Sequence, residues 1–432
     1  RDLVRSRGLG DVYKRQLFTE AAIEKENCAS LLKATDNESE YAVEWASSAS
    51  CTATPWRVVI IGSLNDIVES TLVTDVSPEA RIDTSWIEPG VASWIYWAHN
   101  HGSKDYQILK QYIDLADTLN LPYTLIDAEW DEMSNGGDIN DVAAYAASKG
   151  VKPLIWYNSS TGWINGAPGP KFRLNKPEDR EKEFAWLENN GFAGVKIDFF
   201  PGDGQATMNY YIDLLESAAK HHLLVNFHGA TVPRGWQRTY PNLMSVEGVY
   251  GAEWYNNAPI LTNRAAAHNA TLPFTRNVIG PMDYTPCTFS DSQHPHITSH
   301  GHELALTVLF ESGIQHLADR PESYLAQPAE VLEFFSTLPS TWDETKLLAG
   351  YPGNHTVIAR RKGSDWYIAG INGTDEPMEV TPDYSPVNKG EISGTMFTDS
   401  GKPDNPWSIS SITSLPEKIN MQPRGGFVIK MQ

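Results

Sequence analysis

Lys196 and Asp198 lie on one short apolar segment, and their side chains are of types that could do chemistry together. The segment Val195–Asp198 reads as a strand, in which alternate side chains share a face, so both polar side chains point the same way. A lysine two residues away favours an ionised carboxylate, which is the form that a nucleophile requires. The same pair would serve equally well as a buried ion pair that only stabilises the fold. The residue types alone leave both interpretations open.

Glu247 and Glu253 form a second acidic pair, on a glycine-containing segment. Glu253 is followed by Trp254, and this aromatic neighbour indicates a partly buried carboxyl group whose raised pKa would let it donate a proton. Isolated loop glutamates are usually solvated, which is the alternative. Because no cysteine accompanies the two acids, a metal ion held by them would be Ca²⁺ rather than zinc.

Further polar and aromatic side chains end other apolar segments of the same region. They are Trp97, His99, His101, Asp127, Glu129, Trp130, Asp131, Trp156, Asn158, Asn226, His228, Asp283 and Asp319. Carboxylates serve acetal chemistry, aromatic rings cover the C–H faces of sugars, and amides and histidines bind hydroxyl groups. The set therefore predicts a carbohydrate site.

An alternation of strand-like and helix-like segments must position these side chains. The strand-like segments are 91–97, 123–130, 152–158, 194–200, 223–229, 242–249, 274–280 and 314–319. The helical patterns between most of them are 106–119, 139–149, 177–190, 206–221, 302–312 and 329–338. Eight strands separated mostly by helices predict the α/β class and a (β/α)8 TIM barrel, in which catalytic residues follow the carboxyl ends of strands. An open doubly wound sheet is the alternative, but the glycine-rich phosphate loop typical of it is missing from the sequence.

The regions on either side of this alternation read as β structure. Residues 17–81 are rich in Ser, Thr and short β-branched runs, which indicates the truncated remnant of an N-terminal β-sandwich. Residues 82–90 read as a linker, so that linker and barrel together span 82–343. Residues 344–432 carry short strand patterns between Gly, Pro and Asn turns and are expected to form a small all-β domain. The basic stretch 1–16 has no initiating Met and reads as a sequencing or cloning scar outside the fold.

The composition excludes several classes of protein. The 432 residues carry 34 Lys and Arg against 54 Asp and Glu, a net charge of -20, which argues against a nucleic-acid or anionic-membrane surface. The longest apolar run, Val58–Ile61, is far shorter than the ~20 residues of a membrane span. Cys28 and Cys51 would either pair in an oxidising compartment or stay as free buried thiols, and with Cys287 they make no disulfide framework.

Several ordered motifs resemble glycoside hydrolase family 97. They are Tyr123–Trp130, Gly194–Phe199, Asn226–Thr231, Arg238–Asn242 with Glu247 and Glu253 beyond it, Pro273–Asn277 and Gly280–Pro286. The resemblance implies an N-terminal β-sandwich, here expected to be largely missing, a central (β/α)8 barrel, a C-terminal β domain and a Ca²⁺ ion in the site. It also implies a periplasmic or secreted protein.

The family contains inverting α-glucosidases and retaining α-galactosidases, and local residues distinguish the two. Members of the inverting type carry base glutamates after the third strand and beside the histidine of the fifth. Those places hold Asn158-Ser159-Ser160 and His228-Gly229 here, whereas the fourth strand ends in Asp198, as in the retaining type. The resemblance therefore implies a retaining α-galactosidase that acts on α-linked galactosides and oligosaccharides.

The same resemblance implies a role for each site residue. Asp198 would be the nucleophile and Glu253 the general acid/base, with their carboxyl groups about 5–5.5 Å apart. Glu247 and Glu253 would carry over as calcium ligands. The expected sugar contacts are Asp127, Trp130, Asn158, Lys196 and His228. An α-glucosidase or another α-glycosidase of the family is the alternative enzyme, and a carbohydrate-binding protein with a dead site is the non-enzyme alternative.

Overall fold

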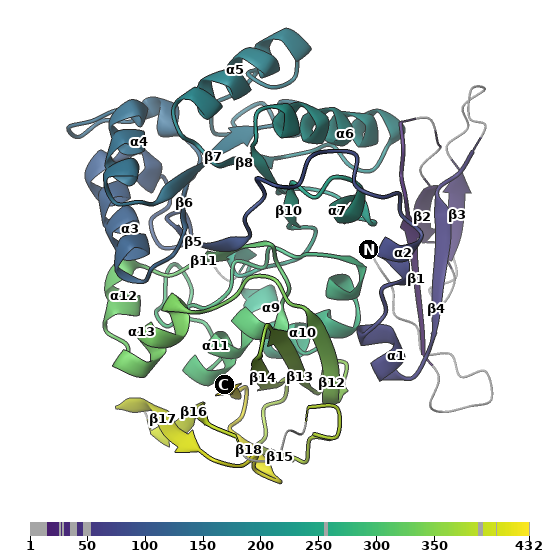
Figure 1. Cartoon of the computed structure of the whole chain (residues 1–432), viewed down its shortest axis with the longest axis vertical. Helices are drawn as coiled ribbons and strands as arrows, with labels where there is room; N and C mark the ends of the chain where they lie inside the picture. Colours follow the sequence, from purple (N-terminus) through teal and green to yellow (C-terminus); the bar gives the residue numbers. More distant parts are fainter. Residues whose placement is uncertain are drawn as a thin grey trace.

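The computed structural model describes residues 15–25, 27, 30–34, 41–45, 53–254, 258–387, 392–402 and 404–431. A central barrel of parallel strands is flanked by an N-terminal group of strands along the right edge of Figure 1 and by a C-terminal antiparallel sheet at the bottom. Cys28 and Cys51, which were considered as a pair, lie outside the described residues.

Seven parallel strands form the barrel, in the spatial order β10-β9-β8-β7-β6-β5-β11. They are β5 (Gly90–Trp94), β6 (Tyr123–Ile126), β7 (Lys152–Asn158), β8 (Gly194–Asp198), β9 (Leu224–Phe227), β10 (Leu243–Val246) and β11 (Ile314–Leu317). The strands are buried on both faces, as parallel strands covered by helices must be. The predicted fold class, a TIM-type barrel with β structure at both ends of the chain, is confirmed.

Helices on the outside of the barrel separate most of these strands (Figure 1). The longer ones are α3 (Tyr106–Thr118), α4 (Ile139–Ser148), α5 (Pro177–Asn189), α6 (Gln205–Lys220), α11 (His300–Leu309) and α13 (Ala329–Ser336). The short ones are α7 (Trp236–Thr239), α9 (Pro259–Thr262), α10 (Ala265–Asn269) and α12 (Pro321–Leu325). Short 3-10 turns are η1 (Gly102–Lys104) and η2 (Trp130–Glu132). Side chains of Asp105, Asp138 and Ser299 accept backbone N–H groups at the starts of α3, α4 and α11, which is why these helices begin there.

The predicted strand at 274–280 is wrong. That stretch forms two 3-10 turns, η3 (Leu272–Phe274) and η4 (Arg276–Ile279), and the non-repetitive segment 281–287 takes the seventh place in the barrel. The N–H of Asp283 donates to the Val246 carbonyl, and the N–H of Ala318 to the Pro286 carbonyl, so the segment bridges β10 and β11. A regular ladder cannot form there because Pro281 and Pro286 have no N–H to donate. The apolar pair Val278 and Ile279, which suggested a strand, packs instead against the N-terminal strands.

The N-terminal strands rest on one side of the barrel. β1 (Arg15–Ala21) pairs antiparallel with β4 (Trp56–Gly62), and β2 (Ser30–Ala34) pairs with β3 (Tyr41–Trp45). Helices α1 (Leu64–Val68) and α2 (Leu72–Asp75) follow. Residues 15 and 16 are part of β1, so the expectation that the whole stretch 1–16 lies outside the fold is wrong for these two residues.

The C-terminal sheet shares its core with the barrel. Its order is β12-β13-β14-β19-β16-β17, with β15 and β18 as a separate pair. The strands are β12 (Glu344–Tyr351), β13 (His355–Lys362), β14 (Asp365–Asn372), β15 (Met378–Val380), β16 (Gly394–Lys402), β17 (Asn405–Ile412), β18 (Ile419–Met421) and β19 (Gly426–Met431). One hydrophobic cluster contains barrel residues together with Ile358, Tyr367, Phe397 and Val428 of the sheet. Helix α11, almost entirely buried, lies between the two parts.

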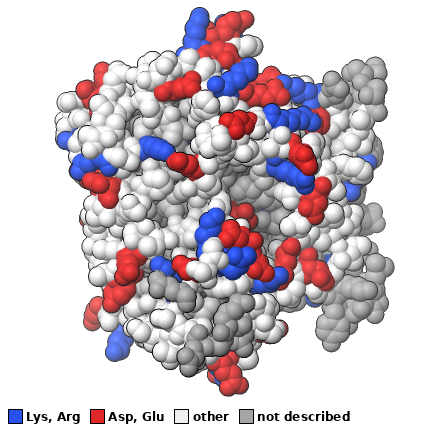
Figure 2. All heavy atoms as spheres, viewed as in Figure 1, with Lys and Arg blue, Asp and Glu red and all other residues white. Residues whose placement is uncertain are grey.

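The surface carries no single dominant charge on the face shown in Figure 2. Acidic and basic side chains are interspersed there, and no continuous basic patch appears. Within the described part of the chain, no helix has both the length and the apolar character needed to cross a bilayer.

Candidate active site

Lys196 lies between two other predicted site residues, Asp127 and Glu253. On β8, Val195 and Ile197 pack into the core, so by alternation Lys196 and Asp198 face the barrel interior. The Lys196 ammonium nitrogen lies 2.9 Å from Asp127 Oδ2 and 3.8 Å from Glu253 Oε1. The first contact is a buried ion pair, and the second brings the Lys196 charge to the predicted acid.

Asp198 is buried and held by two donors. Trp156 Nε1 donates to Asp198 Oδ2 over 3.2 Å, and the N–H of Phe199 donates to Oδ1 over 2.7 Å. Burial raises the pKa of Asp198, while the positive charges of His228 and Lys196 work against that rise. The two hydrogen bonds fix the orientation of the carboxylate.

Gly229 allows the close approach of β9 to Asp198. A Cβ at position 229 would lie 2.8 Å from Asp198 Oδ1, and the residue adopts a φ of +49°, in the left-handed region that favours glycine. No side chain can therefore occupy the place where a base glutamate of the inverting type is expected.

Glu253 lies on a fixed stretch of backbone beside Ala252. The N–H of Ala252 donates to the Tyr284 carbonyl, and Trp97 Nε1 donates to the Ala252 carbonyl. Burial, together with the carboxylates of Glu247 and Asp198, raises the pKa of Glu253 to about 7, against the opposing charges of Lys196 and His228. A carboxyl group with this pKa is able to carry and release a proton near neutral pH.

Glu247, Glu253 and His228 form the one cluster of potential metal ligands found among the described residues. One ligand atom of each lies within 4.8 Å of the others. The N–H of Gly229 donates to Glu247 Oε2, and His228 Nδ1 lies 3.9 Å from the same oxygen. Burial raises the pKa of Glu247, with the His228 charge opposing it. A cavity of about 610 Å³ opens beside Glu247.

Arg276 secures the backbone on which Glu247 stands. Its guanidinium donates to the carbonyls of Val246, Gly248, Gly280 and Pro281 at 2.8 to 3.2 Å. These acceptors belong to two stretches of chain, the end of β10 and the start of segment 281–287. Arg276 therefore positions both stretches relative to each other.

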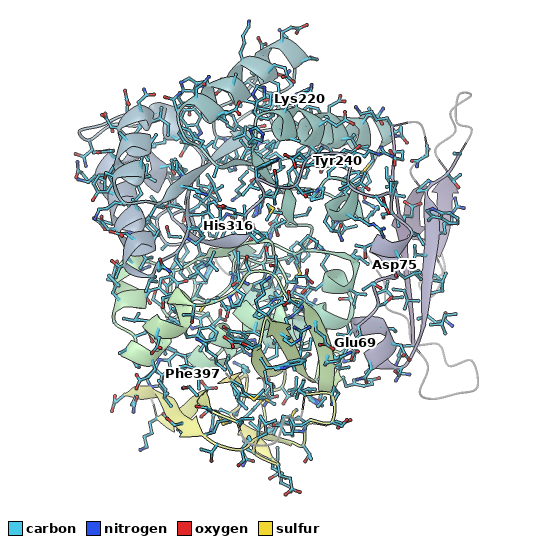
Figure 3. All side chains as sticks on the ribbon, viewed as in Figure 1. Glu69, Asp75, Lys220, Tyr240, His316 and Phe397 are labelled. Carbon is cyan, nitrogen blue, oxygen red and sulfur yellow. The ribbon has the colours of Figure 1, made fainter. Side chains whose placement is uncertain are left out.

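Asp283 gathers three donors at the base of the site. Its Oδ2 accepts from Asn226 Nδ2 and lies 2.8 Å from His228 Nε2 and 2.7 Å from His316 Nδ1. Burial and Lys196 disfavour a proton on His228, but Glu247 and Asp283 outweigh them and raise the pKa of His228 to about 9. His316, labelled in Figure 3, comes from β11. Asp283 was noticed only as a segment-end residue, and His316 was missed although it lies in the predicted strand 314–319, because only the end of that strand was considered.

Tyr96 and Trp94 are further site residues that the sequence reasoning missed. The Lys196 ammonium lies 4.7 Å from the centre of the Trp94 ring, and Trp94 Nε1 donates to Asp127 Oδ2. Burial raises the pKa of Tyr96 to about 12, and the negative charges of Asp127 and Glu253 add to this rise. The alternation along β5 was the available signal, since positions 94 and 96 share a face.

Two predicted sugar contacts, Trp130 and Asn158, serve the scaffold instead. Trp130 is buried against Tyr157, on the outer side of β7, and its indole nitrogen donates to the Trp156 carbonyl. Asn158 donates to the carbonyls of Trp163 and Pro168 and accepts from the N–H of Ser160. Asn158 thus shapes the loop after β7, with its side-chain N–H groups engaged by backbone carbonyls.

Most of the chain is similar to known proteins. Three family models match: "Glycosyl-hydrolase 97 N-terminal" at residues 12–78, "Glycoside hydrolase 97" at 86–249 and "Glycosyl-hydrolase 97 C-terminal, oligomerisation" at 341–432. A "Probable retaining alpha-galactosidase" of Streptomyces bingchenggensis is 41% identical over 370 residues, covering 82% of this chain and 54% of that protein. A "Retaining alpha-galactosidase" of Bacteroides thetaiotaomicron is 29% identical over 413 residues, covering 88% of this chain and 60% of that protein. The chain thus spans little more than half the length of these relatives.

Solved structures agree with this picture. A beta-arabinopyranosidase superposes with a TM-score of 0.88 at 30% identity, covering 96% of this chain and 69% of that one. A family 97 enzyme from Pseudoalteromonas in complex with panose superposes with a TM-score of 0.82 at 22% identity, covering 97% of this chain and 72% of that one, which bears on the fold alone.

Proposed function

The chain belongs to glycoside hydrolase family 97, and from this we propose that it is a retaining α-galactosidase that releases terminal α-linked galactose. The observation that carries the proposal is the pair Asp198 and Glu253. Burial raises the pKa of both groups, but Asp198 is held as a hydrogen-bond acceptor by Trp156 and the Phe199 N–H, whereas the neighbouring carboxylate of Glu247 helps raise the pKa of Glu253 to about 7. Two carboxyl groups in such different environments suit a nucleophile and a proton donor. The positions of the inverting bases hold Asn158 and Gly229, neither of which is a base.

The reaction proceeds by double displacement. Asp198 Oδ attacks the anomeric carbon while Glu253 transfers its proton to the glycosidic oxygen, so the leaving alcohol departs neutral and a galactosyl ester of Asp198 remains. Glu253, now a carboxylate, takes a proton from a water molecule whose oxygen attacks the same carbon. The ester bond breaks, galactose leaves with its original configuration, and both side chains return to their first state.

The remaining polar side chains bind the sugar and hold charges in place. Asp127 and Lys196 keep each other ionised, and both present atoms to the interior where galactose hydroxyl groups would lie. The Asp283 carboxylate orients His228 through Nε2, which leaves Nδ1 on the side of Glu247.

Glu247 and Glu253 would hold a Ca²⁺ ion. Their carboxylate oxygens are the ligand type that calcium prefers, and the two side chains converge beside an open cavity. His228 fits less well, because calcium takes oxygen ligands and His228 Nε2 already pairs with Asp283. When bound, the ion would supply positive charge and rigidity beside the acid.

A β-L-arabinopyranosidase activity is the second candidate, supported by the similarity to a beta-arabinopyranosidase at 30% identity. β-L-Arabinopyranose has the ring configuration of α-D-galactopyranose but lacks the hydroxymethyl group on C5. The lack of one small group changes the binding free energy of a sugar only slightly, so one site can accept both sugars. An α-glucosidase is the third possibility, and its substrate differs from an α-galactoside in the configuration of one hydroxyl group.

The test compares nitrophenyl glycosides of α-galactose, β-L-arabinopyranose and α-glucose, each with EDTA and with added calcium. We expect the highest kcat/KM on the α-galactoside and α-galactose as the first product by ¹H NMR. Calcium should restore any activity that EDTA removes. First release of the β-anomer, or a preference for α-glucoside, would reject the proposal.

The nucleophile has its own test. Asp198→Gly should lower kcat by at least about 10³-fold, because no covalent ester can form. Azide, small enough to enter the vacated space, should restore turnover and yield β-galactosyl azide, identified by NMR. Asp203→Gly, at a nearby aspartate outside the site, is the control. Undiminished activity of Asp198→Gly would remove residue 198 from the mechanism.

A further inference from the structure

Trp163 exposes half of a large apolar side chain on the loop that follows β7. Its exposed fraction is 51%, on a chain whose other tryptophans are mostly buried. An indole left open to water forgoes the stabilisation that its burial would bring. Exposure of a single ring is common on protein surfaces, so the argument depends on how this ring is held and what it adjoins.

The indole is held in place rather than loosely extended. Trp163 Nε1 donates to the Asn165 carbonyl over 2.8 Å, and Asn158 Nδ2 donates to the Trp163 carbonyl. Lys171 Nζ donates to the carbonyls of Ile164 and Ala167. These side-chain bonds close the loop on itself, so the orientation of the ring is fixed before any ligand arrives.

The loop also packs directly on the residue after the nucleophile. A Cβ on Gly162 would lie 2.2 Å from the Phe199 carbonyl oxygen, so only glycine permits this approach. The contact places Trp163 at a set distance from Asp198.

A chain of three aromatic rings leads from the nucleophile to the surface. Trp156, whose indole nitrogen bonds Asp198, lies 5.8 Å from the Phe199 ring at an angle of 70°. The Phe199 ring lies 4.9 Å from the Trp163 ring, again at 70°. Trp163 is therefore two ring contacts from Trp156, the side chain that bonds the nucleophile, and it is the exposed end of this chain of rings.

We propose that Trp163 is a binding platform for the sugar that leaves, so that the substrates are galactosides of other sugars rather than of small alcohols. The apolar C–H face of the leaving sugar packs on the exposed indole face, as sugars do on aromatic rings, and the fixed loop means that little ordering is needed on binding. This inference rests on the proposed galactosidase activity and assigns the class of its leaving group.

The experiment compares leaving groups on one variant. In Trp163→Ala, kcat/KM for melibiose and raffinose should fall about tenfold, mostly through KM, as expected for the loss of one aromatic contact. The value for α-galactosyl fluoride, which has no leaving sugar, should stay within about twofold of the unchanged protein. Trp163→Phe should recover part of the loss.

Trp56→Ala is the matched control, since Trp56 is 62% exposed but lies on β4, in the N-terminal strands. It should leave all three values unchanged. Equal losses on the sugar substrates and on the fluoride would overturn the inference, as would no loss on either. If the unchanged protein hydrolyses none of the three galactosyl compounds, the proposed function itself fails, which is a distinguishable result.

Discussion

Glu253 is the residue at which opposing demands meet. A proton donor needs a raised pKa, whereas Lys196 at 3.8 Å and a bound cation both favour the carboxylate. Burial is the larger influence and raises the pKa to about 7. Lys196 is in turn neutralised by the closer Asp127 at 2.9 Å, so that only part of its charge acts on the acid.

Paired substitutions should separate the two roles of this residue. Glu253→Gln should lower kcat on raffinose by about 10²–10⁴-fold, because the glycosidic oxygen then receives no proton, and lower it much less on α-galactosyl fluoride, whose leaving group needs none. Glu247→Gln weakens the proposed calcium site and removes one negative charge beside Glu253 but leaves the acid in place, so added calcium should restore much of its activity. Both are measured by steady-state kinetics over a calcium titration. Recovery of Glu253→Gln on raffinose with calcium would contradict the acid role.

At this scale the sequence was informative about strands and uninformative about loops. Period-two alternation on β8 indicated that Lys196 and Asp198 share a face. Strand-end position alone suggested Asn158 and Trp130 as sugar contacts, but the side-chain N–H groups of both donate to backbone carbonyls. The hydrogen-bond partners of a side chain at a strand end depend on the path of the loop that follows. The carbonyls that accept from Asn158 lie up to ten residues further along the chain.

Helix α11 is the element that fastens the C-terminal sheet to the barrel. Asp399, from β16, accepts from Ser299 Oγ and from the N–H groups of Gly301 and Gly426 at 2.6 to 2.9 Å. One carboxylate thus satisfies donors at the start of α11 and at the start of β19. Glycine is needed at both partners because a Cβ at either would crowd this contact.

Asp399→Ala should therefore destabilise the whole protein. The expected loss is about 1–2 kcal/mol, that of removing a helix cap, and thermal unfolding would show it as a lower Tm. Asp383→Ala, at an exposed aspartate of the same domain, should change Tm much less. Equal Tm values for both variants would mean that the cap contributes nothing.

The same helix carries a buried histidine that should make stability depend on pH. Burial lowers the pKa of His302 to about 3, and its Nε2 accepts from the Asn269 amide. Below pH 6.5 the unfolded chain binds a proton there and the folded chain does not, so stability is lost as pH falls from 6.5 towards 3. The contribution from pH 7 to pH 5 is about 2 kcal/mol.

His302→Gln should remove that part of the pH dependence. Urea unfolding at pH 7 and pH 5 measures it as a smaller change in free energy for the variant than for the unchanged protein. Parallel changes in the two proteins would show that His302 is protonated in the folded state.

The element that sequence reasoning placed wrongly has a physical explanation. Within residues 274–280, the apolar pair Val278 and Ile279 packs with β1 and β4, outside the barrel, whereas Phe274 packs in the barrel core. Apolar residues in a sequence predict that a segment is buried, but they do not show which elements it packs against. The six predicted helices, which show a 3.6-residue period, were located to within three residues at each end, whereas the short helices α7, α9, α10 and α12 were not predicted.

On the scale of the whole molecule, barrel and C-terminal sheet behave as one body. Their side chains share a single hydrophobic cluster, and Arg360 of β13 donates to the Leu309 carbonyl at the end of α11. The order of a barrel followed by an all-β domain was predictable because the helical period stops near residue 345. That the two would share a core was not, since nothing in a local pattern reports contacts across 50 or more residues.

Removing the C-terminal sheet should therefore unfold the barrel. A chain ending at Ser340 would expose the face of α11 that packs on β14 and β19, and we expect it to lose cooperative thermal unfolding together with the proposed galactosidase activity. Near-ultraviolet circular dichroism over a temperature ramp measures the transition. A truncated chain that unfolds sharply and stays active would show that the barrel is autonomous.

The seventh place in the barrel has a consequence for engineering. Because segment 281–287 is held by Arg276 and a few single hydrogen bonds rather than by a ladder, its path is specific to this set of partners. A chimaera that takes β10 from a homologue but keeps the native segment 281–287 would combine two stretches of chain whose contacts with each other do not match. Recombination within the family should keep 243–287 as one inherited block, with crossovers placed in the helices on either side.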